Sequence, residues 1–227
     1  MRQIPLDIRP ACAPTFDNFV PGDNAELMER LQGLAAPHCY DSIYLWGEAG
    51  SGSSHLLMAT AEAAADSGRP LASVRGRDVG NDLPLPPGGL LIVDEAQGLG
   101  PDAQIALFRA YNTARIIGLS MLVAGDAPPR LLQLREDLRT RIGQALIYQV
   151  QPLSDEDKAE TLLRHAKSRG LNLEPDLINY LLRHGRRDLG SLLAVLDSLD
   201  EQTLVQKRHP TLPLLREILA EREMQAT

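Results

Sequence analysis

Short apolar runs alternate with stretches of helically spaced apolar residues along the first two thirds of the chain. A short apolar run bounded by turn residues is typical of a buried strand, whereas apolar residues three or four positions apart indicate an amphipathic helix. Strands that alternate with helices predict an α/β unit, a parallel sheet with helices on both faces. Asp23 or Asn24 can cap the first helix. The expected strands are residues 42–46, 71–75, 90–96, 119–126 and 145–150, and the expected helices are 25–35, 55–66, 102–118 and 134–142.

The pattern changes at Pro152, after which only helices are expected, roughly four of them. Ser154 and Asp157 have the spacing of a capping box for the first of these helices. The first residues of the chain contain several prolines, which break a helix and favour extended backbone. The sequence therefore divides into an extended N-terminal peptide over 1–14, an α/β domain over 15–151 and a small all-helical domain over 152–227.

Composition limits the classes of function. The 227 residues carry a formal net charge of −7, which argues against wrapping nucleic acid with the whole surface but permits a protein partner. No apolar stretch is long enough to span a membrane, and the N-terminus lacks the apolar core of a secretory signal. The two cysteines and the histidines show no metal-ligand spacing. We expect a cytoplasmic protein with no membrane partner.

The segment GEAGSGSSH, residues 47–55, resembles a phosphate-binding loop between a strand and a helix. In such a loop, glycines allow a tight path along which backbone N–H groups and a helix N-terminus face phosphate oxygens. The Ser54 hydroxyl would reach a magnesium ion. The alternative is an ordinary strand-to-helix turn built from small residues. The candidate nucleotide-binding residues are Gly47, Glu48, Ala49, Gly50, Ser51, Gly52, Ser53, Ser54 and His55.

Ser53 stands where the G-x-x-x-x-G-K-[ST] pattern has lysine. Lysine would contribute a positive charge to the β- and γ-phosphates, and serine keeps only a hydroxyl. The substitution puts ATP hydrolysis by this chain in doubt. Binding is less affected, because the backbone amides of Glu48 to Ser53 remain, and a diphosphate has no γ-phosphate to neutralise.

An apolar run that ends in Asp94 and Glu95 follows the loop by about forty residues and has the Walker B pattern. The aspartate of this pattern holds magnesium, usually through water, and the glutamate can orient an attacking water. The alternative is a strand that ends at a solvated acidic turn. Ser54 and Asp94 are therefore the candidate magnesium residues, held through nucleotide and water, and Glu95 is the candidate base.

Five segments occur in one order along the chain: YLWGEAGSGSSHLL, LLIVDEAQGL, LVAGDAPPRLL, LRTRIGQALIYQVQPLSDEDK and RRDLGSLLAVLDSLD. Together they resemble the AAA+ module of the bacterial replication initiator DnaA, and more closely the Hda-type regulators, which lack the DNA-binding domain. The resemblance covers nearly the whole chain. It implies a P-loop AAA+ sheet followed by a helical lid domain, with ADP or another nucleoside diphosphate and Mg as cofactors.

The resemblance also assigns roles by position. Val20 and Pro21 match the segment that lies along the base, and Asp126, with Gly125, matches sensor 1. Arg187 matches the sensor 2 arginine of the lid. Without the resemblance, Arg187 would be interpreted as the partner of a nearby aspartate, Asp188 or Asp197.

Arg141 matches the arginine finger, which protrudes toward the nucleotide of a neighbouring subunit. A guanidinium suits this role because it stays charged and its planar fork reaches two oxygens. It can raise hydrolysis in the neighbour by roughly a thousandfold or more. Without the resemblance, a surface salt bridge to Glu136 or Asp137 would be the simpler interpretation.

QIPLDI, residues 3–8, resembles the short peptides that bind the replication sliding clamp. An extended peptide of this kind docks apolar anchors in pockets, and here Gln3, Leu6 and Ile8 would be the anchors. The alternative is an edge strand or a tail.

The resemblance thus implies a negative regulator of replication initiation that is tethered to the clamp and stimulates ATP hydrolysis by DnaA. DNA would be reached only through the clamp, and the chain could form homo-oligomers. Two other functions stay open at this point. One is an autonomous ATPase of the helicase-loader type, and the other is a nucleotide-free adaptor between clamp and initiator.

Overall fold

A parallel sheet of five strands forms the centre of the first of two compact units, Ala13–Pro152. The computed structural model describes residues 13–186, 188–206 and 209–225. The strands are ordered β2-β3-β4-β1-β5, and every neighbouring pair is parallel. This confirms the expected fold class. The strands are β1 Ser42–Trp46, β2 Leu71–Arg75, β3 Leu90–Asp94, β4 Ser120–Gly125 and β5 Leu146–Gln149.

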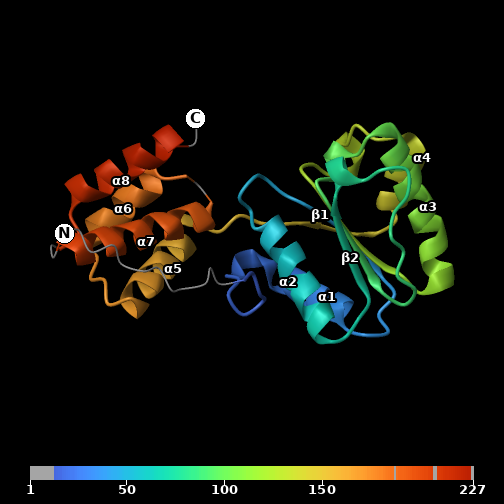
Figure 1. The fold of residues 1–227 in the computed structure, drawn as a ribbon, viewed down its shortest axis with the longest axis horizontal. Coiled ribbons are helices and arrows are strands. Elements are labelled where there is room, and N and C mark those ends of the chain that lie inside the picture. The colour runs from blue at the N-terminus through green and yellow to red at the C-terminus, as the bar shows by residue number, and fades with distance from the viewer. Residues whose placement is uncertain (1–12, 187, 207–208, 226–227) are drawn as a thin grey trace. The chain divides into compact units, whose positions relative to one another are not determined.

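Helices cover both faces of this sheet (Figure 1). α1 Ala25–Ala35 and α2 Ser53–Asp66 pack on one face, where their leucines and alanines join β1 and β3 side chains in one apolar core. α3 Pro101–Ile117 and α4 Glu136–Ile142 pack on the other face around a second core. The central strands are buried on both sides, which explains why they have continuous apolar runs.

Some strands and helices begin or end a few residues away from the positions that the sequence predicts. The strand expected over 90–96 ends at Asp94, because Glu95 has φ 54 and leaves the extended conformation. The helix expected over 55–66 begins at Ser53. The 3-10 turns are η1 Gly22–Asn24, η2 Gly76–Asp78, η3 Ala96–Gly98 and η4 Pro129–Leu131.

The second unit, which includes Leu153–Thr227, contains helices and the loops between them in its described residues, and no strand. Ser154 caps its first helix as expected, since its Oγ accepts a hydrogen bond from Asp157 N at 3.0 Å. Leucines from all of its helices pack into one core. No helix in the described ranges is both long and apolar enough to cross a bilayer. The helices are α5 Asp155–Ser168, α6 Pro175–His184, α7 Leu189–Gln206 and α8 Leu212–Gln225.

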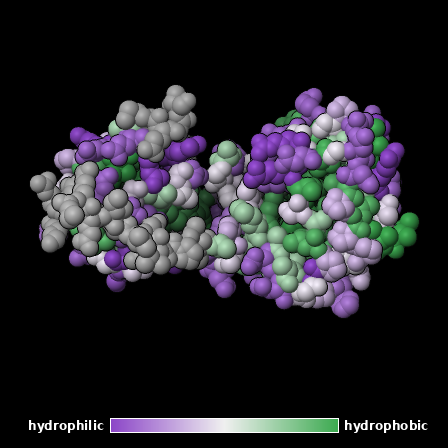
Figure 2. Space-filling view, viewed as in Figure 1, coloured by the Kyte–Doolittle hydropathy of each residue, from purple (hydrophilic) through white to green (hydrophobic). Residues whose placement is uncertain are grey.

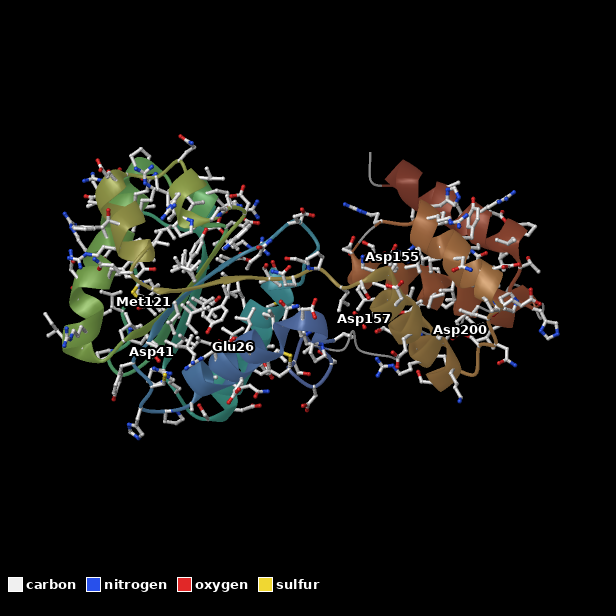
Figure 3. All side chains as sticks on the ribbon, turned by 180° about the vertical axis from the view of Figure 1, so that it is seen from behind. Glu26, Asp41, Met121, Asp155, Asp157 and Asp200 are labelled. Atoms are coloured by element: carbon white, nitrogen blue, oxygen red, sulfur yellow. The ribbon has the colours of Figure 1, made fainter. Side chains whose placement is uncertain are left out.

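A buried arginine holds together the end of the sheet at which the strands begin. Arg69 lies just before β2 and is only 5% exposed. Its guanidinium donates to oxygens of the α1–β1 connection and to groups at the starts of β3 and β4, so one side chain links segments far apart in sequence. Figure 3 labels Asp41 and Met121 at this end of the sheet, where Met121 N donates to Asp41 O at 3.0 Å. The acceptors of Arg69 are Leu34 O, Ala36 O, Cys39 O, Gly89 O and Ser120 Oγ.

Replacing Arg69 by alanine should destabilise the first unit by at least about 3 kcal/mol, since each buried acceptor left without a donor costs about 1–3 kcal/mol. Chemical denaturation of the full chain, followed by a probe in the α/β unit, measures the loss. Arg75→Ala is the matched control, because Arg75 is exposed and its loss should change stability by no more than about 0.5 kcal/mol. Equal stability of the two variants would contradict this role for Arg69.

Candidate functional site

The parallel register brings the predicted site residues to one edge of the sheet. Trp46 of β1 pairs with Gly125 of β4, and Val93 of β3 pairs with Val123 of β4. The residues that follow these strands, including Gly47 and Asp126, therefore emerge side by side. Ligands of open parallel sheets bind at the carboxyl ends of the strands, which is this edge.

Ser54 and Asp94 meet across this edge although they are forty positions apart in sequence. The Ser54 hydroxyl donates to Asp94 Oδ2 at 3.3 Å. A hydroxyl and a carboxylate are oxygen ligands of the kind that Mg²⁺ prefers, and both would contribute only part of its shell. Among the described residues, no group of three or more His, Cys, Asp or Glu could hold a metal by itself. The pair fits a magnesium that is completed by phosphate and water.

The glycine loop follows a path that leaves backbone donors available. Gly50 and Gly52 have φ 82 and 101, in the left-handed region that favours glycine. Ser51 N is used within the loop, where it donates to Glu48 O at 3.0 Å. The amides of Gly50, Gly52 and Ser53 donate to no acceptor within the described ranges. Together with the N-terminus of α2 they form the kind of cradle that binds an anion.

Ser53, at the lysine position, contributes a hydroxyl that is already engaged. Its Oγ lies 3.0 Å from Ser51 Oγ. Ser51 is buried, and a Cβ at Gly47 would come within 2.6 Å of its Oγ, so the loop is closely packed at this point. One of the two hydroxyls donates to the other, and neither brings a charge to the loop.

His55 does not replace the missing lysine. Its Nε2 lies 2.9 Å from Thr15 O, and its ring packs at 51° against Phe19 with 5.3 Å between centroids. The Phe19 ring also covers Gly52, where an added Cβ would come within 2.9 Å of it. The segment that precedes Val20 is therefore fastened to the glycine loop. Sequence reasoning missed Thr15 and Phe19, because nothing in their local pattern indicates these contacts.

Asn24 holds the predicted base-lining segment in place. Its side-chain amide donates to Pro21 O at 3.1 Å and to Gln151 O at 2.9 Å, and its Oδ1 accepts from Gln151 N at 2.8 Å. Of the two expected caps, Asp23 and Asn24, the structure places Asn24 at the N-cap position of α1, but the expected capping hydrogen bond from its side chain is not formed. The side chain instead links the turn at Pro21 to Gln151, two residues after the end of β5.

Glu95 is held in a strained backbone conformation. Its φ of 54 is rare for a residue other than glycine, and such strain often occurs at functional sites. Glu95 N donates to Asp94 Oδ1 at 2.8 Å, and Glu95 Oε2 lies 3.9 Å from Arg77 Nε. A Cβ at Gly76 would come within 2.3 Å of Glu95 O, so only glycine fits beside it.

Asp126 follows β4 at an exposed position beside the glycine loop. Buried Tyr44 controls the backbone around it, because its hydroxyl donates to Ala127 O at 2.7 Å. An added Cβ at Gly125 would come within 2.4 Å of the same hydroxyl. Burial, with a smaller contribution from the Asp126 charge, raises the pKa of Tyr44, so this hydroxyl stays protonated as a donor.

The edge as a whole is acidic. Glu48, Asp94, Glu95 and Asp126 surround the loop, and in the described part of the chain their only ion pair is the one between Glu95 and Arg77. A ligand with several negative charges would need a bound cation to offset these carboxylates.

Arg141 lies exposed on α4 without a carboxylate partner among the described residues. Its Nη1 donates to Gln144 Oε1 at 3.3 Å, and its guanidinium lies 5.9 Å from the centroid of the Phe108 ring. The alternative interpretation, a salt bridge to Glu136 or Asp137, is wrong, because Asp137 pairs with Arg135 at 2.8 Å and Glu136 forms no ion pair within the described ranges. Figure 2 shows hydrophilic side chains over the part of this unit where α4 lies.

Four predicted site residues, Gln3, Leu6, Ile8 and Arg187, lie outside the described residues. The aspartates considered as alternative partners of Arg187 have other contacts. Asp188 Oδ2 lies 3.9 Å from Arg186 Nε. Asp197 Oδ1 pairs with His165 at 2.7 Å and Arg169 at 3.1 Å.

Comparison with known families identifies the helical unit. Residues 155–219 match the family model described as the lid domain of Hda. The match spans α5, α6 and α7 and most of α8.

Solved structures with a similar fold include replication initiators. Domain III of the Thermotoga maritima replication initiation protein DnaA has a TM-score of 0.74 and 18% identity, over 91% of this chain and 95% of that one. AMPPCP-bound DnaA from Aquifex aeolicus has a TM-score of 0.68 and 20% identity, over 82% of this chain and 64% of that one. The Thermotoga maritima RuvB Holliday junction branch migration motor has a TM-score of 0.66 and 17% identity, over 91% of this chain and 71% of that one. The expected AAA+ fold is confirmed.

Gly52→Ala should destabilise the α/β unit by about 1–3 kcal/mol, because alanine is strained at positive φ and its Cβ would press on Phe19. Thermal unfolding measures the change. Gly80→Ala is the control, since Gly80 has open space around it and no positive φ. If both alanines are equally tolerated, the close contact between loop and Phe19 is incorrect.

Proposed function

Because the chain is an Hda-type, DnaA-related AAA+ protein, we propose that it is a negative regulator of replication initiation that acts on DnaA. It holds a nucleoside diphosphate in the glycine loop and is tethered to the sliding clamp through residues 3–8. It presents Arg141 to the nucleotide of ATP-bound DnaA, whose hydrolysis then ends the active state of the initiator.

The glycine loop favours a diphosphate over a triphosphate. Its free amides can donate to phosphate oxygens, but Ser53 offers no charge, and the surrounding carboxylates repel each added phosphate. Ser54 and Asp94 would hold magnesium, which offsets negative charge when it is bound. The γ-phosphate of ATP adds negative charge that no lysine balances. ADP should therefore bind with a smaller electrostatic penalty than ATP.

The exposed guanidinium of Arg141 is the observation that carries the proposal. An arginine that stabilises charge in a partner must be at the surface and must keep its own charge unneutralised before the partner arrives. Arg141 meets both conditions, since its contacts are a neutral amide and an aromatic ring. Both contacts leave donors of the guanidinium free.

An autonomous ATPase is favoured less by these residues. Asp94 and Glu95 have the chemistry of a hydrolytic site, but the loop lacks the lysine that stabilises the β- and γ-phosphates. We therefore propose that the guanidinium of Arg141 supports ATP hydrolysis in DnaA, and that the chain does not hydrolyse ATP rapidly by itself.

Arg141→Ala should lower DnaA ATP hydrolysis stimulated by this chain by about a thousandfold, to near the unstimulated rate, because no other group would supply the charge. Phosphate release from ATP-bound DnaA, measured with clamp loaded on DNA, tests this expectation. Arg115→Ala is the control, since Arg115 is also exposed but lies on α3 near its end. Full stimulation by Arg141→Ala would overturn the mechanism.

Calorimetric titration of the apo chain with Mg²⁺ and ADP should give saturable heat, and ADP should raise Tm. At a ligand concentration a hundredfold above Kd the stabilisation would be about 2.7 kcal/mol. ATP should bind more weakly than ADP, and Ser53→Lys should narrow that difference by restoring a cation. Absence of both heat and thermal stabilisation would favour the nucleotide-free adaptor.

The double variant Gln3→Ala, Leu6→Ala should lose co-elution with the sliding clamp, because it removes the amide and one apolar anchor of the peptide. Asp7→Ala changes the same segment outside the anchor positions and should retain binding. Unchanged co-elution of the double variant would refute the tether while leaving the role of Arg141 open to its own test.

A further inference from the structure

We propose that Arg135 is a positioning residue that keeps Arg141 available by occupying Asp137. This inference rests on the proposed function, because it explains how Arg141 stays without a carboxylate partner among the described residues.

Asp137 and Arg141 have the spacing of an intrahelical ion pair. Both lie on α4, four positions apart, so their side chains share one face of the helix. An acidic residue N-terminal to a basic one at this spacing is the favourable orientation. From the helix alone, Asp137 and Arg141 are therefore expected to pair, and the guanidinium would be partly neutralised.

In the structure, Asp137 forms its ion pair with Arg135 instead of Arg141. Arg135 Nε donates to Asp137 Oδ1 at 3.2 Å, and Arg135 Nη2 donates to Asp137 Oδ2 at 2.8 Å. This is a two-point contact between a planar fork and a carboxylate, which is stronger and better oriented than a single contact. Both carboxylate oxygens are used, since Oδ1 also accepts from Leu138 N at 2.8 Å. The hydrogen bond and charge of Arg135 lower the pKa of Asp137.

The backbone of Arg135 is fixed in a way that favours this contact. Arg135 N donates to the Oε1 of Gln104, a buried residue of α3 whose Nε2 donates to Leu99 O. Arg135 precedes α4 with ψ 142, in extended conformation, and its side chain can fold back over the first turn. Because Gln104 ties Arg135 to α3, the Arg135 side chain starts from a defined point beside Asp137.

The contact between Arg135 and Asp137 lowers the free-energy cost of bringing Arg141 to the nucleotide of the partner. If Asp137 were free, it would compete with the phosphate oxygens of the partner for Arg141, and the ion pair would have to break in each encounter. A surface pair at this spacing is weak, so the competition should lower stimulated hydrolysis by about twofold. Occupation of Asp137 by Arg135 removes this competition before the partner binds.

The first test is independent of any partner. The carboxyl pKa of Asp137 is measured by NMR titration in the full chain, in Arg135→Gln and in Arg135→Gln, Arg141→Gln. We expect the pKa to stay lowered in Arg135→Gln, because Arg141 takes over, and to rise in the double variant. Equal pKa values in the single and double variants would mean that Asp137 does not reach Arg141, and would overturn the inference.

The second test measures stimulated hydrolysis by DnaA at saturating concentrations of this chain. Arg135→Gln should be about twofold slower than wild type, and Arg135→Gln, Asp137→Asn should recover the wild-type rate. Asp137→Asn alone should leave the rate unchanged. Arg130→Gln is the matched control, since it removes the same charge from an exposed residue that has no ion pair in the described ranges.

The double variant separates positioning from a general structural or electrostatic role. If Arg135 contacted DnaA directly or held α4 in shape, Asp137→Asn would not restore the rate, and that result would overturn the inference. The proposed function fails by a different outcome, which is full stimulation by Arg141→Ala. The two failures are therefore distinguishable.

Discussion

The candidate site depends on the parallel register of the central strands. Because β1, β3 and β4 run in the same direction and are paired in register, Gly47, Asp94 and Asp126 emerge at one edge. The opposite edge is held by Arg69, which donates to acceptors before β1 and at the starts of β3 and β4. One end of the sheet is thus fixed by a buried cation, and the other end presents loops and carboxylates to a ligand.

The two arginines of this unit illustrate opposite uses of the same side chain. Arg69 is buried, and its two terminal nitrogens donate to neutral oxygens, which makes it structural. Arg141 is exposed, and among the described residues its side chain contacts Gln144 and Phe108 but no carboxylate. The glycine loop has no such cation at Ser53. The proposed action on the nucleotide of another protein is consistent with these two features, a loop without a positive charge at the lysine position and an exposed positive charge on α4.

Much of the fold could be predicted from the sequence, because apolar runs and turn residues report directly on buried strands and their ends. The helix at Ala25–Ala35 and the strand at Ser42–Trp46 were expected with the same bounds. The end of β3 was missed because the left-handed conformation of Glu95 depends on the close approach of Gly76. The cap at Asn24 was wrong because a distant backbone group, at Gln151, binds its side chain.

The order of elements, the glycine loop with its missing lysine, and the acidic pair at the end of β3 can be predicted from the amino-acid sequence, since each is a local pattern of residue types. Which side chains meet depends on how the chain folds. Ser54 reaches Asp94 and Phe19 covers Gly52 because the sheet and its helices bring distant segments together. Within the described part of the chain, Asp137 pairs with Arg135, whose backbone is held to α3 by Gln104, and Arg141 has no carboxylate partner. In contacts of this kind, side chains that are close in space compete for the same partner. Spacing along the sequence does not show which of them forms the contact.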